Sequence, residues 1–255
     1  MIDSHCHLTH DRFGSDLQGV LDRARAAGIE CCVTIGTGVE DSGRALALSR
    51  ESGGFVRCTA GLDPFSAHRV ADRFEEAFER LSLLLRSGGF CAVGEIGLDY
   101  HYDLDPRPVQ RDRLERQLAL AEELDLPVVI HVREAHADMV EVLTDHPASR
   151  GVIHSFTAGL AEAERYLDLG WYVAFNGVLT FKNAEAVREA ARRVPEERLL
   201  VETDSPYLAP APFRGKRCEP AYVAHTLELL ARLRAISLAE AARATADNAR
   251  RLFRL

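Results

Sequence analysis

Short runs of apolar residues alternate along the chain with longer stretches in which apolar side chains recur at helical spacing. The apolar runs cover residues 1–3, 31–37, 55–62, 91–98, 127–132, 151–156, 171–175 and 199–204. The helical stretches cover residues 15–27, 40–52, 69–86, 110–124, 135–145, 161–169, 184–193 and 222–234. Short, continuously apolar strands separated by helices are typical of a parallel sheet that is buried on both faces.

Eight such strand–helix units in succession predict an α/β protein with a (β/α)8 TIM barrel. Ser237 and Glu240 have the spacing of a capping box, so we expect an additional C-terminal helix after the eighth unit. A doubly wound open sheet is the alternative, because periodicity alone does not show closure. The chain has no low-complexity tract and no linker, and residues 1–255 are expected to form a single domain.

The composition is that of a globular enzyme, with 47% hydrophobic and 27% charged residues. No apolar run approaches the ~20 residues of a membrane span, and the start of the chain has neither the basic region nor the apolar core of a signal peptide. The six cysteines show no C-x-x-C spacing and are expected to be buried thiols. We therefore expect a cytoplasmic protein with no membrane partner, and a monomer, because a barrel of this kind is self-contained.

Six ionisable residues fall at or near the carboxyl ends of the expected strands. They are His5, His7, Glu95, His131, His154 and Asp204. The carboxyl ends of barrel strands meet at one mouth, where barrel enzymes carry their chemistry. Each residue alone has an ordinary explanation as a hydrogen-bonded core residue or an ion-pair partner. Burying all six together is costly without compensation, and coordination of cations provides that compensation.

The spacing of the first two histidines supports a metal site. Residues i and i+2 of a strand point to the same face, so His5 and His7 can reach one ion while Cys6 points away. Six ligands are too many for one catalytic ion with an open position, and they suit two divalent ions that share a bridging carboxylate. Imidazoles favour Zn or Mn, while carboxylates and a phosphate substrate also accept Mg.

Several motifs are shared with a known family. The segments "DSHCHL", "GEIGLDY", "PVVIHVRE", "HSFTAG", "TFKNA", "ETDSPYL" and "CEPAYV" resemble the TatD family of metal-dependent deoxyribonucleases, within the amidohydrolase-like barrel superfamily. The resemblance runs from residue 2 to about residue 253. It implies metal-dependent cleavage of DNA, often exonucleolytic from the 3′ end.

The resemblance also implies a role for each of the six residues. The two ligand groups, which would share Glu95 as the bridge, are His5, His7 and Asp204 for one ion and His131 and His154 for the other. Asp204 and Glu95 would be the catalytic residues, and Asp204 would also orient or deprotonate the attacking water.

The segment "GLDPFSAH" departs from the family pattern, which usually has Gly-x-His-Pro-His after the third strand. Asp63 replaces the first histidine and Phe65 the second. Asp63 could accept a proton, bind a metal-bound water or coordinate an extra cation, but it would repel a phosphate. His68 could partly substitute for the missing histidine, or it is a solvated loop residue. Cys218 stands where asparagine is common and is a minor change near the mouth.

Residues near the mouth are expected to contact substrate. The predicted substrate-binding residues are Asp63, His68, Arg133 and Tyr207. Arg133 could hold a phosphate through a bidentate contact, or it forms a salt bridge with Glu134 or Asp99. Tyr207, Tyr100, Tyr102 and Phe65 could stack unpaired bases, or they pack the rim. Glu202 could support a metal ligand from behind.

These features lead to three functional hypotheses. The first is a phosphodiesterase with two divalent ions, acting as a 3′-5′ exodeoxyribonuclease on single-stranded DNA ends. The second is a hydrolase of small amides, lactones or other esters on the same centre. The third, a non-catalytic partner-binding barrel, is disfavoured because all six ligands are present. The net charge of −8 argues against binding along duplex DNA, although bound cations can supply local positive charge.

Overall fold

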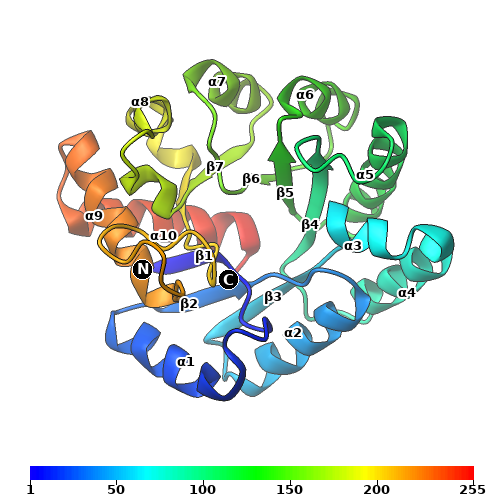
Figure 1. Cartoon of the computed structure of the whole chain (residues 1–255), viewed down its shortest axis with the longest axis horizontal. Helices are drawn as coiled ribbons and strands as arrows, with labels where there is room; N and C mark the ends of the chain where they lie inside the picture. The colour runs from blue at the N-terminus through cyan, green and yellow to red at the C-terminus, as the bar shows by residue number, and fades with distance from the viewer.

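A computed structural model describes residues 1–255, with eight parallel strands in sequential order and helices around them (Figure 1). The strands are β1 (Ile2–Cys6), β2 (Cys31–Thr34), β3 (Val56–Ala60), β4 (Ala92–Asp99), β5 (Val128–Arg133), β6 (Gly151–Ile153), β7 (Tyr172–Phe175) and β8 (Leu199–Val201). The helices are α1 (Leu17–Ala26), α2 (Val39–Glu51), α3 (Pro64–Arg69), α4 (Phe74–Arg86), α5 (Arg107–Glu123), α6 (His136–Asp145), α7 (Leu160–Asp168), α8 (Glu185–Arg193), α9 (Val223–Arg234) and α10 (Leu238–Phe253). Short 3₁₀ segments are η1 (Gly14–Asp16), η2 (Ala71–Arg73), η3 (Gly177–Thr180), η4 (Glu196–Arg198) and η5 (Pro220–Tyr222).

The sheet closes on itself between the chain after β8 and the end of β1. Cys6 pairs in parallel with Ser205. The backbone N–H of His7 donates to the carbonyl of Ser205 at 2.7 Å, and the N–H of Asp204 donates to the carbonyl of His5 at 2.9 Å. The predicted (β/α)8 barrel is therefore confirmed, and the open-sheet alternative is wrong.

The additional C-terminal helix α10 covers the amino-terminal end of the barrel. Its apolar residues Ala246, Ala249, Leu252 and Phe253 form one buried cluster with strand residues such as Val33. The helix begins at the predicted capping box, because the N–H of Glu240 donates to Ser237 Oγ at 3.2 Å and the Glu240 side chain accepts from Ser237 N at 2.9 Å. The barrel is thereby packed shut at the end opposite the strand carboxyl termini.

The stretch 69–86 was expected to be one helix and is instead divided into α3, η2 and α4. The Asp63 side chain accepts the N–H groups of Phe65 and Ser66 at 3.3 and 3.1 Å, and Pro64 occupies the first turn. An N-cap acid followed by proline begins a helix. The expectation that a helix starts at residue 69 is therefore wrong, because the cap at residue 63 begins a separate helix, α3, before it.

All six cysteines are free and buried, as expected. Cys6 points away from the mouth, and its thiol donates to the carbonyl of Val33 at 3.4 Å. None of the helices combines the length and the apolar character that crossing a membrane would require.

An ion-pair network links α1 to the segment that precedes α9. Arg23 reaches Glu219 with Nε at 2.6 Å and Nη2 at 3.1 Å, and Arg217 Nη2 lies 2.8 Å from the same carboxylate. Asp16 accepts from both arginines. Burial acts to raise the pKa of Glu219, but the hydrogen bonds from Arg23 and Arg217 outweigh it and hold the pKa below its ordinary value.

Replacing this carboxylate should destabilise the fold in a pH-dependent way. We expect Glu219→Gln to lower the free energy of unfolding by about 1.5 to 3 kcal/mol at neutral pH, because hydrogen bonds to a charged group are lost. The folded-state pKa lies below the unfolded value near 4.5, so this stabilisation exists above pH 4.5 and is lost as the pH falls through the folded-state pKa. Urea unfolding of both proteins from pH 7 to pH 3.5 measures the difference.

The control is Asp22→Asn, which breaks the exposed pair between Asp22 and Arg25 at 3.2 Å. Its effect should stay below about 0.5 kcal/mol, as for other surface pairs. A Glu219→Gln difference that does not shrink at low pH would contradict the role of the charged carboxylate.

Candidate metal centre

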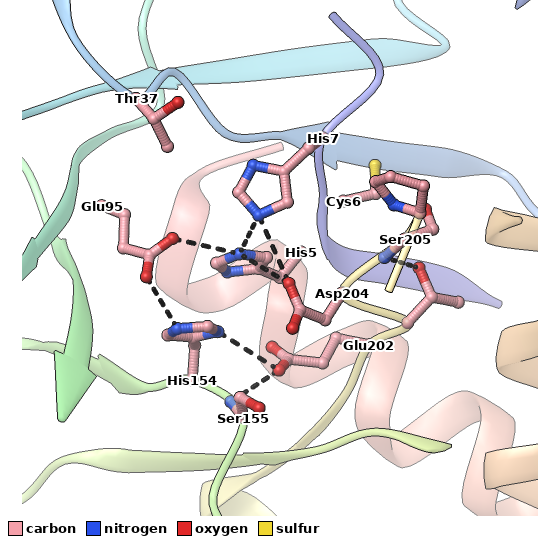
Figure 2. Close-up of polar contacts among 12 residues, drawn as sticks. His5, Cys6, His7, Thr37, Glu95, His154, Ser155, Glu202, Asp204 and Ser205 are labelled. Atoms are coloured by element: carbon pink, nitrogen blue, oxygen red, sulfur yellow. Dashed lines mark hydrogen bonds and ion pairs between the residues drawn. The ribbon is translucent and has the colours of Figure 1, made fainter. Parts of the chain in front are cut away.

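The structure brings all six predicted ligands to the carboxyl-terminal mouth of the barrel. They lie on five segments: His5 in β1 and His7 just after it, Glu95 in β4, His131 in β5, His154 directly after β6, and Asp204 after β8. Figure 2 shows five of them turned toward one another, with Cys6 directed elsewhere. Convergence on one point follows from the parallel barrel, in which every strand ends at the same face.

The first group consists of His5, His7 and Asp204. The Nε2 atoms of the two histidines are 3.2 Å apart. Asp204 Oδ1 lies 3.3 Å from His7 Nε2 and 3.6 Å from His5 Nε2 (Figure 2). The side-chain alternation along β1 that the sequence predicted is what turns both imidazoles to the same side.

Glu95 connects this group to a second one. Its Oε1 lies 2.8 Å from His131 Nδ1 and 3.0 Å from His154 Nε2, while its Oε2 lies 3.5 Å from His5 Nε2. The ligand atoms of Glu95, His131 and His154 lie within 4.8 Å of one another, and so do those of His5, His7 and Glu95. Each group therefore has donor types that suit a divalent cation, and Glu95 directs one carboxylate oxygen to each.

Two further carboxylates lie behind the histidines of the second group. Asp99 Oδ2 is 3.0 Å from His131 Nε2, the ring nitrogen that faces away from Glu95. Glu202 Oε1 is 3.5 Å from His154 Nδ1 and accepts the N–H of Ser155 at 2.6 Å. Such outer carboxylates fix the tautomer and orientation of a metal-binding imidazole.

Glu202 was predicted from the sequence to support a metal ligand from behind. Asp99 was predicted only as a possible salt-bridge partner of Arg133. A signal was present, since Asp99 follows Glu95 by four residues in one strand and so shares its face. Figure 2 shows Glu202 beside His154, at the edge of the ring away from Glu95.

The charges of the cluster balance one another. Burial acts to raise the pKa of Glu95, but the nearby His154 and His131 hold it well below its ordinary value. Burial acts to lower the pKa of His131, but hydrogen bonds to Asp99 and Glu95 raise it to about 9. The ionised Glu95 carboxylate thus faces a protonated His131 imidazole at neutral pH, and a divalent cation that displaces that proton provides the same compensation.

A cavity of about 910 Å³ opens over these residues. Its wall includes the predicted contacts Asp63, Arg133 and Tyr207. His68 is outside the wall, with its side chain 44% exposed and its Nδ1 3.2 Å from Asp105 Oδ1. His68 is therefore a solvated surface residue, which was the alternative to its predicted role in substrate binding.

Arg133 and Tyr102 form one side of the mouth. The Arg133 guanidinium lies 5.0 Å from the centre of the Tyr102 ring. Neither of the salt bridges considered for it is formed, because Glu134 pairs with His101 at 2.7 Å and Asp99 with His131 at 3.0 Å. Tyr102 is 52% exposed. Arg133 and Tyr102 are therefore both available to a ligand in the cavity.

The other aromatic residues divide by exposure. Tyr207 is 44% exposed beside His7, with ring centres 6.0 Å apart. Phe65 meets the Tyr102 ring edge-on at 5.2 Å. Tyr100 is buried and donates its hydroxyl hydrogen bond to Asp138 at 2.7 Å. The prediction that a base could stack on Tyr100 is therefore wrong, because the Tyr100 ring is buried in the rim.

Asp63 is buried in the cavity wall, where its carboxylate caps α3. Burial and the nearby Glu95 carboxylate both raise its pKa. Its oxygens are engaged by the N–H groups of Phe65 and Ser66. The residue that departs from the family pattern therefore has a structural role of its own.

Removing the charge behind His131 should weaken metal binding. We expect Asp99→Asn to lower the affinity for Mn²⁺ by about 10- to 100-fold, because the outer partner that orients the imidazole is lost. Isothermal titration calorimetry measures the affinity. The matched control is Asp138→Asn, which removes a carboxylate bound to Tyr100 rather than to a histidine of the cluster; equal affinities in both variants would contradict the role of Asp99.

The chain matches a protein-family model, described as TatD-related DNase, over residues 2–254. It is 37% identical over 257 residues to the uncharacterized metal-dependent hydrolase YabD of Bacillus subtilis, covering 100% of this chain and 99% of the relative. It is 36% identical over 262 residues to a protein of Edwardsiella piscicida named 3′-5′ ssDNA/RNA exonuclease TatD, covering 100% of both.

A solved structure shows the same similarity. The TatD homologue YjjV of Escherichia coli superposes with a TM-score of 0.93 and 32% sequence identity, over 100% of this chain and 98% of that one. Similarity in sequence and in fold thus extends over the full length of the chain. The protein belongs to the TatD-related DNase family and is a metal-dependent hydrolase.

Proposed function

We propose that the protein is a 3′-5′ exodeoxyribonuclease that acts on single-stranded DNA ends with two divalent cations, Mg, Mn or Zn. The observation that carries the proposal is the position of Glu95, whose two carboxylate oxygens face two separate histidine groups. A bridging carboxylate of this kind is suited to a pair of ions, and a pair of ions is suited to displacement at phosphorus.

The six ligands would hold the ions as the two groups described above, with Glu95 between them. Bound cations would supply activation of a water molecule and neutralisation of charge on the phosphoryl oxygens. Asp204 is suited to orient that water and to accept its proton. Burial acts to raise its pKa, but His7 and the other imidazoles hold the pKa below its ordinary value, so the carboxylate is ionised at neutral pH.

Single-stranded DNA is supported by the side chains around the cavity. Arg133 has no carboxylate partner and can bind a phosphate with two parallel hydrogen bonds. Tyr102 and Tyr207 are exposed at the mouth, and unpaired bases stack on such aromatic side chains. The Edwardsiella relative named as an exonuclease of single strands supports the same substrate and polarity.

Two features of the chain support the proposed setting of this activity. All ligands come from one polypeptide, which supports a monomer as the active unit. The six free, buried thiols are compatible with a reducing compartment, as in the cytoplasm.

Hydrolysis of small amides, lactones or other esters is the second candidate. It is favoured by Asp63, a carboxylate in the cavity wall where the family usually has a histidine. A negative charge at that position disfavours a phosphate and is neutral toward an uncharged ester.

Glu95→Ala tests the metal centre. We expect it to lose both the bound metal and hydrolysis, with a decrease in rate beyond the roughly 10- to 100-fold that loss of an outer partner causes. Metal analysis of dialysed protein by plasma mass spectrometry gives a readout independent of activity. Glu79→Ala, at an exposed residue of α4, is the matched control and should retain both properties. Full DNA cleavage by Glu95→Ala would exclude the mechanism.

Substrate and polarity are tested with single-stranded DNA labelled at either end, with Mg, Mn and Zn in turn. We expect the 3′ label to be released at once as a mononucleotide and the 5′ label to pass through a ladder of shortening strands. A panel of lactones and amides is assayed in parallel. Hydrolysis of that panel without any cleavage of DNA would establish the second candidate in place of the first.

A further inference from the structure

A smaller groove branches from the cavity between the amino-terminal turn of α2 and the segment α3–η2–α4. Its volume is about 180 Å³. Thr37, Asp41, Arg44 and Arg69 belong to the walls of both spaces, so the groove is continuous with the cavity over the metal centre. None of the residues predicted from the sequence to bind substrate lies in it.

The groove is locally basic in a protein whose net charge is −8. Its wall contains four arginines and three acids, namely Arg44, Arg69, Arg73 and Arg80 with Glu40, Asp41 and Glu76. Two of the arginines are already paired, Arg80 with Glu40 at 2.8 Å and Arg44 with Asp41 at 2.9 Å.

Arg69 and Arg73 have no carboxylate partner. The Arg69 guanidinium donates only to Ser66 Oγ, at 2.9 Å, and the Arg73 side chain makes no hydrogen bond. Both residues are exposed. A planar guanidinium with free N–H groups is the side chain best shaped to bind a phosphate oxygen pair.

The break in the helical stretch after β3 puts these two arginines where they are. Asp63 and Pro64 start α3 early, α3 ends at Arg69, and η2 carries the chain to Arg73 before α4 begins. Arg69 at the end of α3 and Arg73 at the end of η2 both lie in the wall of the groove. The groove and its unpaired charges thus come from the same local fold.

We infer that the groove is a second phosphate-binding subsite, in which Arg69 and Arg73 hold the phosphodiester backbone of the strand whose end lies at the metal centre. The inference rests on the proposed nuclease function. A polyanion with repeated phosphates can reach the metal centre and the groove together, whereas a small ester fills only the cavity. Contacts of this type position a strand without reading its sequence.

The variant Arg69→Gln/Arg73→Gln tests the subsite in the intact, metal-loaded protein. We expect KM for a single-stranded ten-nucleotide DNA to rise about 10-fold, with a clearly smaller rise for a dinucleotide that is too short to reach the groove. Loss of two phosphate contacts should also reduce the slope of log KM against log salt concentration by about 1.4. The control Arg50→Gln/Arg165→Gln removes two exposed arginines elsewhere, on α2 and α7, and should leave the length dependence unchanged.

The outcomes separate the subsite from the function. If the wild-type protein cleaves both substrates and the groove variant shows an equal rise in KM for both, or none, the subsite is wrong and the nuclease function stands. If the wild-type protein cleaves neither DNA substrate, the proposed function fails and the inference with it. The single variant Arg73→Gln changes an exposed side chain without hydrogen bonds, so it keeps the test valid if the double variant unfolds.

Discussion

Closure of the barrel at the end of β1 is the interaction on which the candidate metal centre depends. The carbonyl of His5 accepts the N–H of Asp204, and the carbonyl of Ser205 accepts the N–H of His7. Two segments nearly 200 residues apart in the chain are thereby held in register, and the register puts Asp204 Oδ1 within reach of both histidines. Without this pairing the first ligand group has no carboxylate of its own.

Electrostatic compensation is the second constraint. Glu95 and His5 are buried, and each is costly to bury as an isolated charge or as an unpaired polar group. They are tolerated because they face one another, with Asp99 and Glu202 completing the outer contacts. The same arrangement that makes the cluster stable in the protein alone gives it the ligand types and the geometry to hold divalent cations.

Features set by residues close together in the chain could be predicted from the sequence. Features set by residues far apart in the chain could not. The alternation that turns His5 and His7 to one side and Cys6 to the other is local, and so is the capping box at Ser237. The pairing of His131 with Asp99 depends on the register between β4 and β5, which apolar runs do not reveal.

The start of α3 is a local feature that the prediction missed. The Asp63–Pro64 pair is a capping signal in the sequence, but Asp63 was interpreted only as a replaced histidine. Other features are set by tertiary packing. The burial of Tyr100 and the surface position of His68 depend on how the loops pack, for which a sequence pattern contains no signal.

The helix α10 leaves the barrel with only one open end. Because its apolar residues pack into the amino-terminal end of the strands, the barrel has no opening there and is not a channel. Whatever reaches Glu95 enters and leaves by the same side. A linear polymer therefore cannot be threaded through the protein, and the part of it that meets the buried ligands is a free terminus or a sharply bent segment.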